Sequence, residues 1–213
     1  MNPPSPIPFA DFVDPAANWN RRFGGADYHF GTEPNEWLRE HASVWRAGDR
    51  VLCVADGEGR NSVWLASRGL VVDAFDIADV GVAKARRLAE AQGVSVNFAV
   101  ADCDSFSWPQ AAYDGVAAIF VQFADPALRE RLFTRIVQSL KPGGMLVLQG
   151  YTPKQLEYRT GGPSVASHLY TQELLRTAFA ELEIVELREY EAKLTEGSAH
   201  AGHSALIGLV ARR

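Results

Sequence analysis

The chain has 213 residues, 47% of them hydrophobic and 22% charged, and its net charge is −5 at pH 7. The composition is typical of one globular domain and excludes wholesale disorder, and the negative charge argues against a broad nucleic-acid surface. No apolar run is long enough to span a membrane, and the N-terminus does not resemble a secretory signal. The only two cysteines, Cys53 and Cys103, lie in strand-like stretches, so we expect a cytoplasmic protein with neither a disulfide framework nor a metal site.

The N-terminal part divides into an arm and an aromatic-rich segment. Residues 1–16 are rich in proline and lack periodicity, so we expect a flexible arm, followed by a single domain over residues 17–213. Aromatic side chains are frequent within residues 17–47. Pro34, a residue favoured in a first helical turn, predicts a helix over residues 34–46.

From residue 51 the pattern alternates regularly between strands and helices. The predicted strands cover residues 51–55, 70–76, 94–100, 113–121 and 145–149. The predicted helices between them cover residues 61–68, 79–92 and 126–140. Short apolar strands linked by helices are typical of a mostly parallel sheet with helices on both faces, so we expect a doubly wound α/β fold.

The last part of the chain predicts a long loop, a helix and two strands. Residues 152–170 form a loop of a length that is usually functional. A helix is expected over residues 171–179. Strands over 182–190 and 204–210 follow, and we expect them to pair antiparallel at the sheet edge across the polar connection 192–203.

Three strand ends carry residues suited to ligand binding, because open α/β sheets bind ligands beyond the carboxyl ends of their strands. The first strand leads into Asp56-Gly57-Glu58-Gly59-Arg60-Asn61, where two glycines let a ligand approach the backbone before a helix. The second ends at Asp76, which can accept both hydroxyls of a ribose if Asp79 caps the next helix. The third ends at Asp102-Cys103-Asp104, where an aspartate can accept a hydrogen bond from an exocyclic amine. Each feature also has a purely structural alternative: the glycines could serve only a tight turn, Asp76 could serve only as a helix cap, and the aspartate after the third strand could be an ordinary loop carboxylate.

The glycine turn distinguishes between ligand classes. A dinucleotide fingerprint needs a third glycine where Ser62 stands, and the phosphate-binding P-loop signature is absent. Asp56 and Glu58 would repel a pyrophosphate. The turn therefore favours a ligand that is cationic or carries an amino group.

These segments resemble the motifs of class I S-adenosylmethionine (SAM)-dependent methyltransferases from about residue 19 to residue 213. The matching stretches are VLCVADGEGRN, DAFDIADVGVAKAR, VADCDSF, YDGVAAIFVQF and LKPGGMLVLQGY. The resemblance implies a Rossmann-like seven-stranded sheet of order 3-2-1-4-5-7-6, with strand 7 antiparallel and helices on both faces. It implies SAM as the cofactor, with a ribose at Asp76, adenine at Asp102 and Cys103, and these cofactor-binding residues: Arg22, Tyr28, Asp56, Gly57, Glu58, Gly59, Arg60, Asn61, Asp76, Ile77, Asp102, Cys103 and Phe120.

A narrower resemblance is to the tellurite-resistance (TehB-like) branch, carried by WNRRF, YHFGTEPNEWL and HAGHSALIGLVARR. It implies that residues 17–47 form a helical lid over the cofactor. The common acidic residue of the first strand is Cys53 here, so Asp56, Glu58 or backbone carbonyls would hold the methionine amino group. Arg22 and Arg60 are alternatives for the methionine carboxylate.

The resemblance implies methyl transfer to a small-molecule acceptor, and the acceptor stays open. A chalcogen oxyanion or thiol needs little help from a base, whereas an organic oxygen or nitrogen acceptor requires one. A protein that binds SAM or S-adenosylhomocysteine (SAH) without catalysis and a nicotinamide oxidoreductase are further hypotheses. The sequence identifies no catalytic residue; the candidates are His200, His203 and Arg159, while His168 is given no role, and the oligomeric state stays open.

Overall fold

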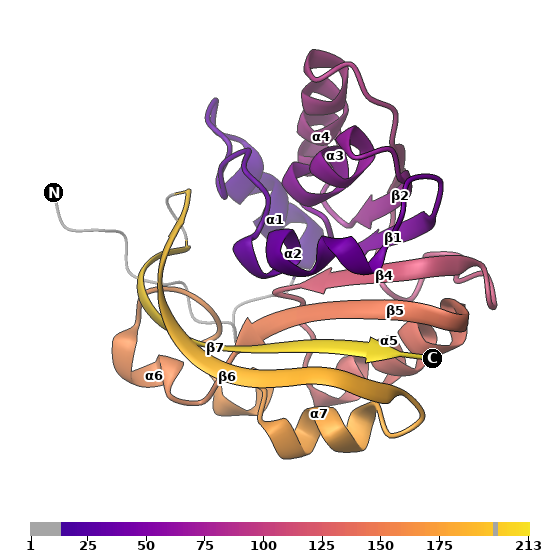
Figure 1. The fold of residues 1–213 in the computed structure, drawn as a ribbon. Helices are drawn as coiled ribbons and strands as arrows, with labels where there is room; N and C mark the ends of the chain where they lie inside the picture. Colours follow the sequence, from indigo (N-terminus) through magenta and orange to yellow (C-terminus); the bar gives the residue numbers. More distant parts are fainter. Residues whose placement is uncertain (1–13, 198–199) are drawn as a thin grey trace, which may run out of the picture.

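The computed structural model describes residues 14–197 and 200–213 and contains a seven-stranded sheet (Figure 1). The strand order is β3-β2-β1-β4-β5-β7-β6, and β7 pairs antiparallel with both β5 and β6, while the other pairs are parallel. The strands are β1 (Arg50–Val54), β2 (Val71–Asp76), β3 (Asn97–Val100), β4 (Tyr113–Ile119), β5 (Leu140–Tyr151), β6 (Glu183–Glu196) and β7 (His200–Arg212). The expected strand order and the antiparallel strand are confirmed.

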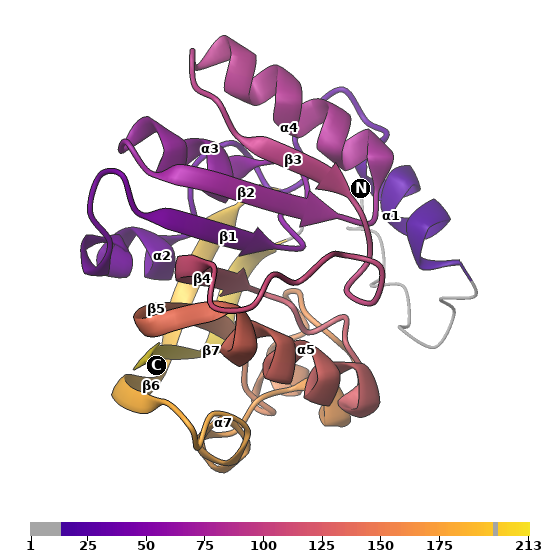
Figure 2. The same ribbon diagram turned by 90° about the vertical axis from the view of Figure 1, so that its right-hand side faces the viewer.

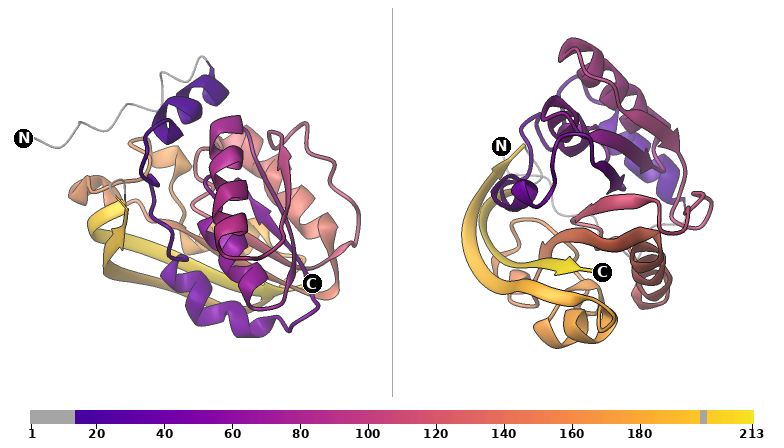
Figure 3. Two further views of the ribbon diagram at one scale, coloured as in Figure 1. Left: turned by 90° about the horizontal axis from the view of Figure 1, so that it is seen from above. Right: turned by 45° about the vertical axis from the view of Figure 1, so that its right-hand side comes forward.

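Helices cover both faces of the sheet, as the rotated views show (Figures 2 and 3). Helices α2, α3 and α4 pack on one face, and α5 and α7 pack on the other. The helices are α1 (Pro15–Phe23), α2 (Glu36–His41), α3 (Arg60–Ser67), α4 (Asp79–Ala91), α5 (Pro126–Ser139), α6 (Gln155–Tyr158) and α7 (Gln172–Ala178), with 3₁₀ turns at Ala42–Val44 and Ala166–His168. In the described part of the chain, none of these helices has the length and apolar character that a membrane crossing requires.

The continuous apolar run of β1 reflects its central place between two helical layers. Val51, Leu52, Cys53 and Val54 are all buried. Leu52 and Val54 pack in the cluster under α5, whereas Val51 and Cys53 pack in the cluster under α2 to α4. A strand covered on both faces needs apolar residues at successive positions, which is why its sequence lacks alternation.

Two expected boundaries near the N-terminus are wrong. Helix α1 begins at Pro15, inside the expected arm, because Asp14 Oδ1 accepts from the Ala17 amide at 3.0 Å and Pro15 occupies the first turn. The rest of the arm, residues 1–13, lies outside the described residues. The helix expected over 34–46 is shorter, since Asn35 caps α2 and the chain changes to a 3₁₀ turn after His41.

The expected polar connection over 192–203 is also wrong, because β6 and β7 continue through most of it. The two strands extend past the rest of the sheet and curl toward the N-terminal segment (Figure 1). At the end of β6, Glu196 accepts from Asn35 Nδ2 at 2.9 Å and pairs with Arg60 Nη2 at 2.7 Å. This end of the hairpin is polar because it bonds a distant segment through side chains.

The close packing of α3 against α4 depends on Gly59, which occupies the N-cap position before α3 with φ +91°. A Cβ at this position would lie 2.6 Å from the Cβ of Ala85 and 2.8 Å from its Cα. Gly93, at the end of α4, also has positive φ (+66°), but a Cβ there would meet nothing within 4 Å.

We expect Gly59→Ala to lower the free energy of unfolding more than Gly93→Ala does. The left-handed backbone costs either alanine about 1–2 kcal/mol, and the collision with Ala85 adds about 1–3 kcal/mol at position 59 only. Urea unfolding of both variants measures the difference. Equal losses would show that the helices separate without cost.

Candidate active site

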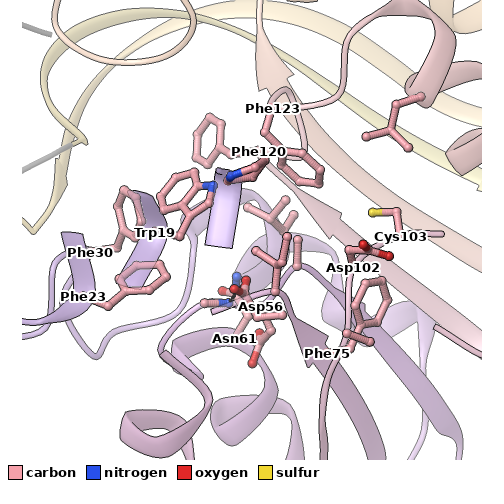
Figure 4. Close-up of a pocket in the computed structure, with 18 of the residues that line it drawn as sticks. Trp19, Phe23, Phe30, Asp56, Asn61, Phe75, Asp102, Cys103, Phe120 and Phe123 are labelled. Carbon is pink, nitrogen blue, oxygen red and sulfur yellow. Dashed lines mark hydrogen bonds between the residues drawn. The ribbon is translucent and has the colours of Figure 1, made fainter. Parts of the chain in front are cut away.

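A cavity of about 530 Å³ lies beyond the carboxyl ends of β1, β2 and β4 (Figure 4). Strands β1 and β4 are neighbours although β2 follows β1 in the chain, so this is the place where the strand order reverses and where open α/β sheets bind ligands. The described residues that line the cavity are Pro15, Trp19, Phe23, Phe30, Ala55, Asp56, Gly57, Arg60, Asn61, Phe75, Asp76, Ile77, Ala101, Asp102, Cys103, Asp104, Ile119, Phe120, Phe123, Asp125, Leu128 and His168.

The glycine turn forms one wall of the cavity, and α1 lies over it. Gly57 has φ +64°, and a Cβ there would lie 3.3 Å from the ring of Phe23. Phe23 stacks on Trp19 with ring centroids 5.4 Å apart, and both rings line the cavity. The small residue therefore lets the aromatic side chains of α1 approach the turn after β1.

Asp76 connects the turns that follow β1 and β2. Its carboxylate is buried and accepts from the Gly57 amide at 2.9 Å and from the Ala78 amide at 2.8 Å. The expectation that Asp79 caps α4 is wrong, because Ala78 occupies the cap position and Asp79 lies in the first turn. A carboxylate has about four acceptor sites, so Asp76 can still accept a hydrogen bond from a ligand.

Burial raises the pKa of two carboxyl groups in this cavity. The pKa of Asp76 rises to about 6, although the amides of Ala78 and Gly57 oppose the shift. The pKa of Asp56 rises to about 7, and hydrogen bonds from Ser62 oppose the shift. A cation bound beside either group would favour the ionised form. The pair therefore suits a ligand that carries positive charge.

Glu58, Tyr28 and Gly59, three expected cofactor-binding residues, are not among the described residues that line the cavity. Glu58 is buried, forms an ion pair with Lys84 Nζ and accepts from the His29 amide at 2.6 Å. Tyr28 donates from its hydroxyl to the Lys84 carbonyl at 3.2 Å. These contacts hold the N-terminal segment against α4, and they leave Asp56 as the carboxylate of the turn that faces the cavity.

The two expected carboxylate-binding arginines lie in different places. Arg60 lines the cavity, and its guanidinium pairs with Glu196 at 2.7 Å and lies 5.9 Å from the ring centroid of Phe30. The guanidinium of Arg22 lies 4.7 Å from the ring centroid of Trp19, and Arg22 is not among the described lining residues. Of the two, Arg60 is the one that faces the cavity.

Asp102 and Cys103 line the far side of the cavity from Trp19 and Phe30 (Figure 4). Asp102 Oδ1 accepts from the amides of Asp104 at 2.9 Å and Ser105 at 2.6 Å, and hydrogen bonds from Ser105 lower its pKa. Burial raises the pKa of Cys103 to about 12, so its side chain is a thiol. Asp102 therefore shapes its own loop as well as facing the cavity.

Phe120 closes the cavity at the end of β4. It has φ +55°, a conformation that is rare for a bulky residue and concentrated at functional sites. Its amide donates to the Gln149 carbonyl at 2.8 Å, and its ring stacks on Tyr151 with centroids 4.7 Å apart. The backbone and the ring contact together hold Phe120 in the cavity wall.

Two of the three sequence-derived catalytic candidates, Arg159 and His203, are not part of the cavity lining that the structure describes. Arg159 is exposed, and His203 is exposed with its Nε2 2.8 Å from Glu191, and neither is among the described lining residues. The side chain of His200 lies outside the described residues. His168, to which the sequence gave no role, lines the cavity instead.

No cluster of three or more metal-ligating side chains occurs within residues 14–197 and 200–213. Cys53 and Cys103 are buried and unbridged. Sequence analysis also missed Trp19, Phe123 and Leu128 as lining residues. No local pattern marks them, because each reaches the cavity through the packing of its element.

Comparison with known proteins identifies the class of this fold. Residues 51–144 match the family described as "Methyltransferase domain". Over 110 residues the chain is 36% identical to a demethylmenaquinone methyltransferase of Thermus thermophilus, a match that covers 51% of this chain and 50% of that protein. A 37% identical match over 106 residues to a ribosomal RNA small subunit methyltransferase C of Chromohalobacter salexigens covers 48% of this chain and 31% of that protein. The chain thus matches half or less of the length of these curated relatives.

Solved structures extend the likeness over most of the chain. A structure from work on the conversion of a disulfide bond into a thioacetal group during echinomycin biosynthesis has a TM-score of 0.74 at 17% identity and covers 93% of this chain and 89% of that chain. The N-methyltransferase NodS from Bradyrhizobium japonicum, in complex with SAH, has a TM-score of 0.69 at 17% identity and covers 93% and 97%. TehB from Haemophilus influenzae has a TM-score of 0.68 at 15% identity and covers 93% and 66%.

The fold is therefore the Rossmann-like fold of methyltransferases. Together with the family match, the two curated relatives support the expected SAM-dependent methyltransferase and SAM as its cofactor. The likeness to TehB at 15% identity shows the shared fold alone, so it does not distinguish the tellurite-resistance branch.

We expect Asp56→Asn to stabilise the protein at pH 8 in the absence of ligand. The pKa of Asp56 is about 7 in the folded chain against an ordinary 3.8, so the folded state binds this proton more tightly than the unfolded state. Stability therefore falls as pH rises from about 4 to about 7, and the full loss is present above pH 7. Asparagine removes the titration and can still accept from the Ser62 amide.

Thermal unfolding across pH 4–8 measures this effect. The variant should unfold at a higher temperature than the unsubstituted protein at pH 8, and the difference should vanish toward pH 4. A constant difference at all pH values would show that the carboxyl group does not titrate in the folded chain.

Proposed function

We propose that this protein transfers a methyl group from SAM to a small-molecule acceptor. The observation that carries the proposal is the buried carboxylate of Asp76, which faces the same cavity as the glycine turn and is held by the Gly57 amide. A carboxylate at the end of the second strand can accept the two hydroxyls of a ribose. The family match over residues 51–144 supports SAM as the molecule that carries this ribose.

The cavity fits SAM in size and in charge. Its volume of about 530 Å³ lies within the range of small-molecule sites, about 300–1,000 Å³. Aspartates outnumber cationic side chains among its described lining residues, which suits a ligand with a sulfonium and an amino group. Aromatic rings from α1 and from the end of β4 also line it, and such rings attract cations and stack on bases.

We assign the parts of the cofactor to the two sides of the cavity. Asp76 and Ile77 would hold the ribose, and Asp102 and Cys103 would flank the adenine. Asp56 would hold the amino group of the methionine moiety, and Arg60 and Asn61 would lie near its carboxylate. Each of these residues lines the cavity, and the positively charged amino group would relieve the cost of the buried Asp56 carboxylate.

SAM, when bound, supplies an activated methyl group on a sulfonium. The residues of this chain have to align the acceptor with that methyl group and exclude water from it. Trp19, Phe23 and Phe30 cover the glycine turn and fit the lid role that we propose for residues 17–47. The loop 152–170 contributes His168 to the same cavity, as a substrate-side loop would.

The acceptor class separates two versions of this proposal. A chalcogen oxyanion or thiol fits the tellurite-resistance resemblance, and a small organic oxygen or nitrogen compound is the alternative. We propose that the protein is cytoplasmic, and we propose no nucleic-acid or membrane partner. The net charge of −5 and the unbridged cysteines agree with these expectations.

Titration calorimetry with SAM and SAH tests the cofactor, and Asp76→Asn tests its site. We expect micromolar binding of both compounds and a loss of about 1.5–3 kcal/mol, or about 10- to 150-fold, in the variant because a charge-assisted hydrogen bond is removed. Asp114→Asn is the matched control, since Asp114 pairs with Lys141 at the opposite end of β4. Tighter binding of NADH than of either compound, or unchanged affinity in Asp76→Asn, would contradict the proposal.

A further inference from the structure

Helix α1 packs on α4 through a small apolar contact. The structure describes every residue of α1, and among them only Phe23 is buried; a Cβ at Gly81 of α4 would lie 2.8 Å from its ring. Asn20 adds two hydrogen bonds, because its Nδ2 donates to Asp79 at 2.5 Å and its Oδ1 accepts from the Val80 amide at 3.1 Å. One buried ring attaches a helix weakly, so polar contacts have to provide much of the attachment.

Lys84 on α4 provides the largest group of these polar contacts. Its side chain is buried, although lysine is a charged residue. Its Nζ donates to the carbonyls of Phe23 at 3.2 Å, Gly25 at 3.0 Å and Asp27 at 2.6 Å. An ammonium group has three hydrogens, so these carbonyls fill its donor capacity. Since Phe23 ends α1, and the last carbonyls of a helix have no partner within it, Lys84 both ends α1 and holds the segment that follows.

Glu58 balances the charge of Lys84 from the glycine turn. The two side chains form a buried ion pair, and Glu58 also accepts from the His29 amide at 2.6 Å. Removal of the ammonium alone would leave three carbonyls without their donor and a buried carboxylate without its ion pair. Both costs are relieved when the segment leaves α4 and these groups reach water. The docked position of α1 therefore depends on one side chain.

The docked helix covers one side of the cavity. Trp19 and Phe23 line the cavity, and a Cβ at Gly57 would lie 3.3 Å from the ring of Phe23, so α1 lies over the glycine turn. Asp102 and Cys103 line the side opposite Trp19 (Figure 4). In the proposed arrangement of the cofactor, α1 thus covers the methionine moiety, and other elements hold the adenine.

We propose that Lys84 is a positioning residue for the cofactor: it holds residues 23–27 on α4, sets α1 over the glycine turn and so determines how tightly the methionine moiety is bound. The inference rests on the proposed function. Lys84 acts through α1, since it is not among the described residues that line the cavity. The apparent affinity of a ligand falls with the fraction of molecules whose site is complete, so release of α1 weakens the ligands that it covers.

Lys84→Met tests the anchor, because methionine has a similar length but neither a charge nor a donor. Arg87→Met is the matched control, since it removes a positive charge from an exposed position of the same helix. Lys84→Met combined with Glu58→Gln serves as a second variant if Lys84→Met does not fold, because it also removes the unpaired buried charge. Glutamine at position 58 can still accept from the His29 amide.

Limited trypsin digestion of the full chain reports whether α1 is released. No lysine or arginine precedes Arg21 in the chain, so a fragment that starts at Met1 and ends at Arg21 or Arg22 comes from cleavage within α1. Cleavage of a locally opened segment follows its open population, so we expect this fragment to form at least about 10-fold faster in Lys84→Met than in the unsubstituted protein. Arg87→Met should match the unsubstituted protein, and saturating SAH should slow the cleavage of Lys84→Met.

Titration calorimetry with SAH and with adenosine reports which part of the cofactor α1 covers. If α1 is docked in about 1–10% of the Lys84→Met molecules, the affinity for SAH falls about 10- to 100-fold. Adenosine lacks the amino-acid part, so its affinity should fall less than about threefold. General damage to the cavity would weaken both compounds alike, so the difference between them separates positioning from a loss of stability.

The outcomes separate this inference from the proposed function. If neither SAM nor SAH binds the unsubstituted protein, the proposed function and the positioning role are both refuted. If SAH binds but Lys84→Met is cleaved at Arg21 and Arg22 no faster than the unsubstituted protein, Lys84 is not the anchor of α1. If cleavage is faster but the affinity for SAH is unchanged, or SAH and adenosine lose affinity equally, α1 does not position the methionine moiety.

Discussion

The geometry of the cavity depends on one buried carboxylate. Asp76 accepts from the amides of Gly57 and Ala78 and so fixes the turns after β1 and β2 relative to each other. Burial raises its pKa to about 6, which means that an ionised group is held out of water at neutral pH. Perturbed carboxyl groups concentrate at binding sites, because their charge is available to a ligand rather than to solvent.

Two buried ion pairs attach distant segments to this centre. Lys84 pairs with Glu58, and Arg60 pairs with Glu196 at the end of the extended β6. Lys84 Nζ also donates to the carbonyls of Gly25 and Asp27, which holds the N-terminal segment against α4. Removing one partner of such a pair leaves a buried charge, so both pairs constrain the walls of the cavity strongly. The N-terminal segment and the hairpin thus act as parts of the site.

The two sides of the cavity differ in chemistry in a way that suits a transfer reaction. Ionisable groups at Asp56 and Asp76 face the proposed cofactor side. Phe120, Phe123, Leu128 and His168 also line the cavity. An apolar wall excludes water from a bound ligand.

The sequence alone determined the sheet order, the antiparallel strand and the strand ends that carry Asp56, Asp76 and Asp102. These features depend on apolar runs and turn residues, which are local, and on motifs that the chain shares with methyltransferases. Only the tertiary structure decided that Glu58 pairs with Lys84 rather than facing the cavity, that β6 continues to Glu196 and that His168 enters the site. The contacts responsible join residues 46 positions apart for Gln122 and His168 and 136 apart for Arg60 and Glu196. No local pattern encodes such pairs, because each forms when separately folded elements pack together.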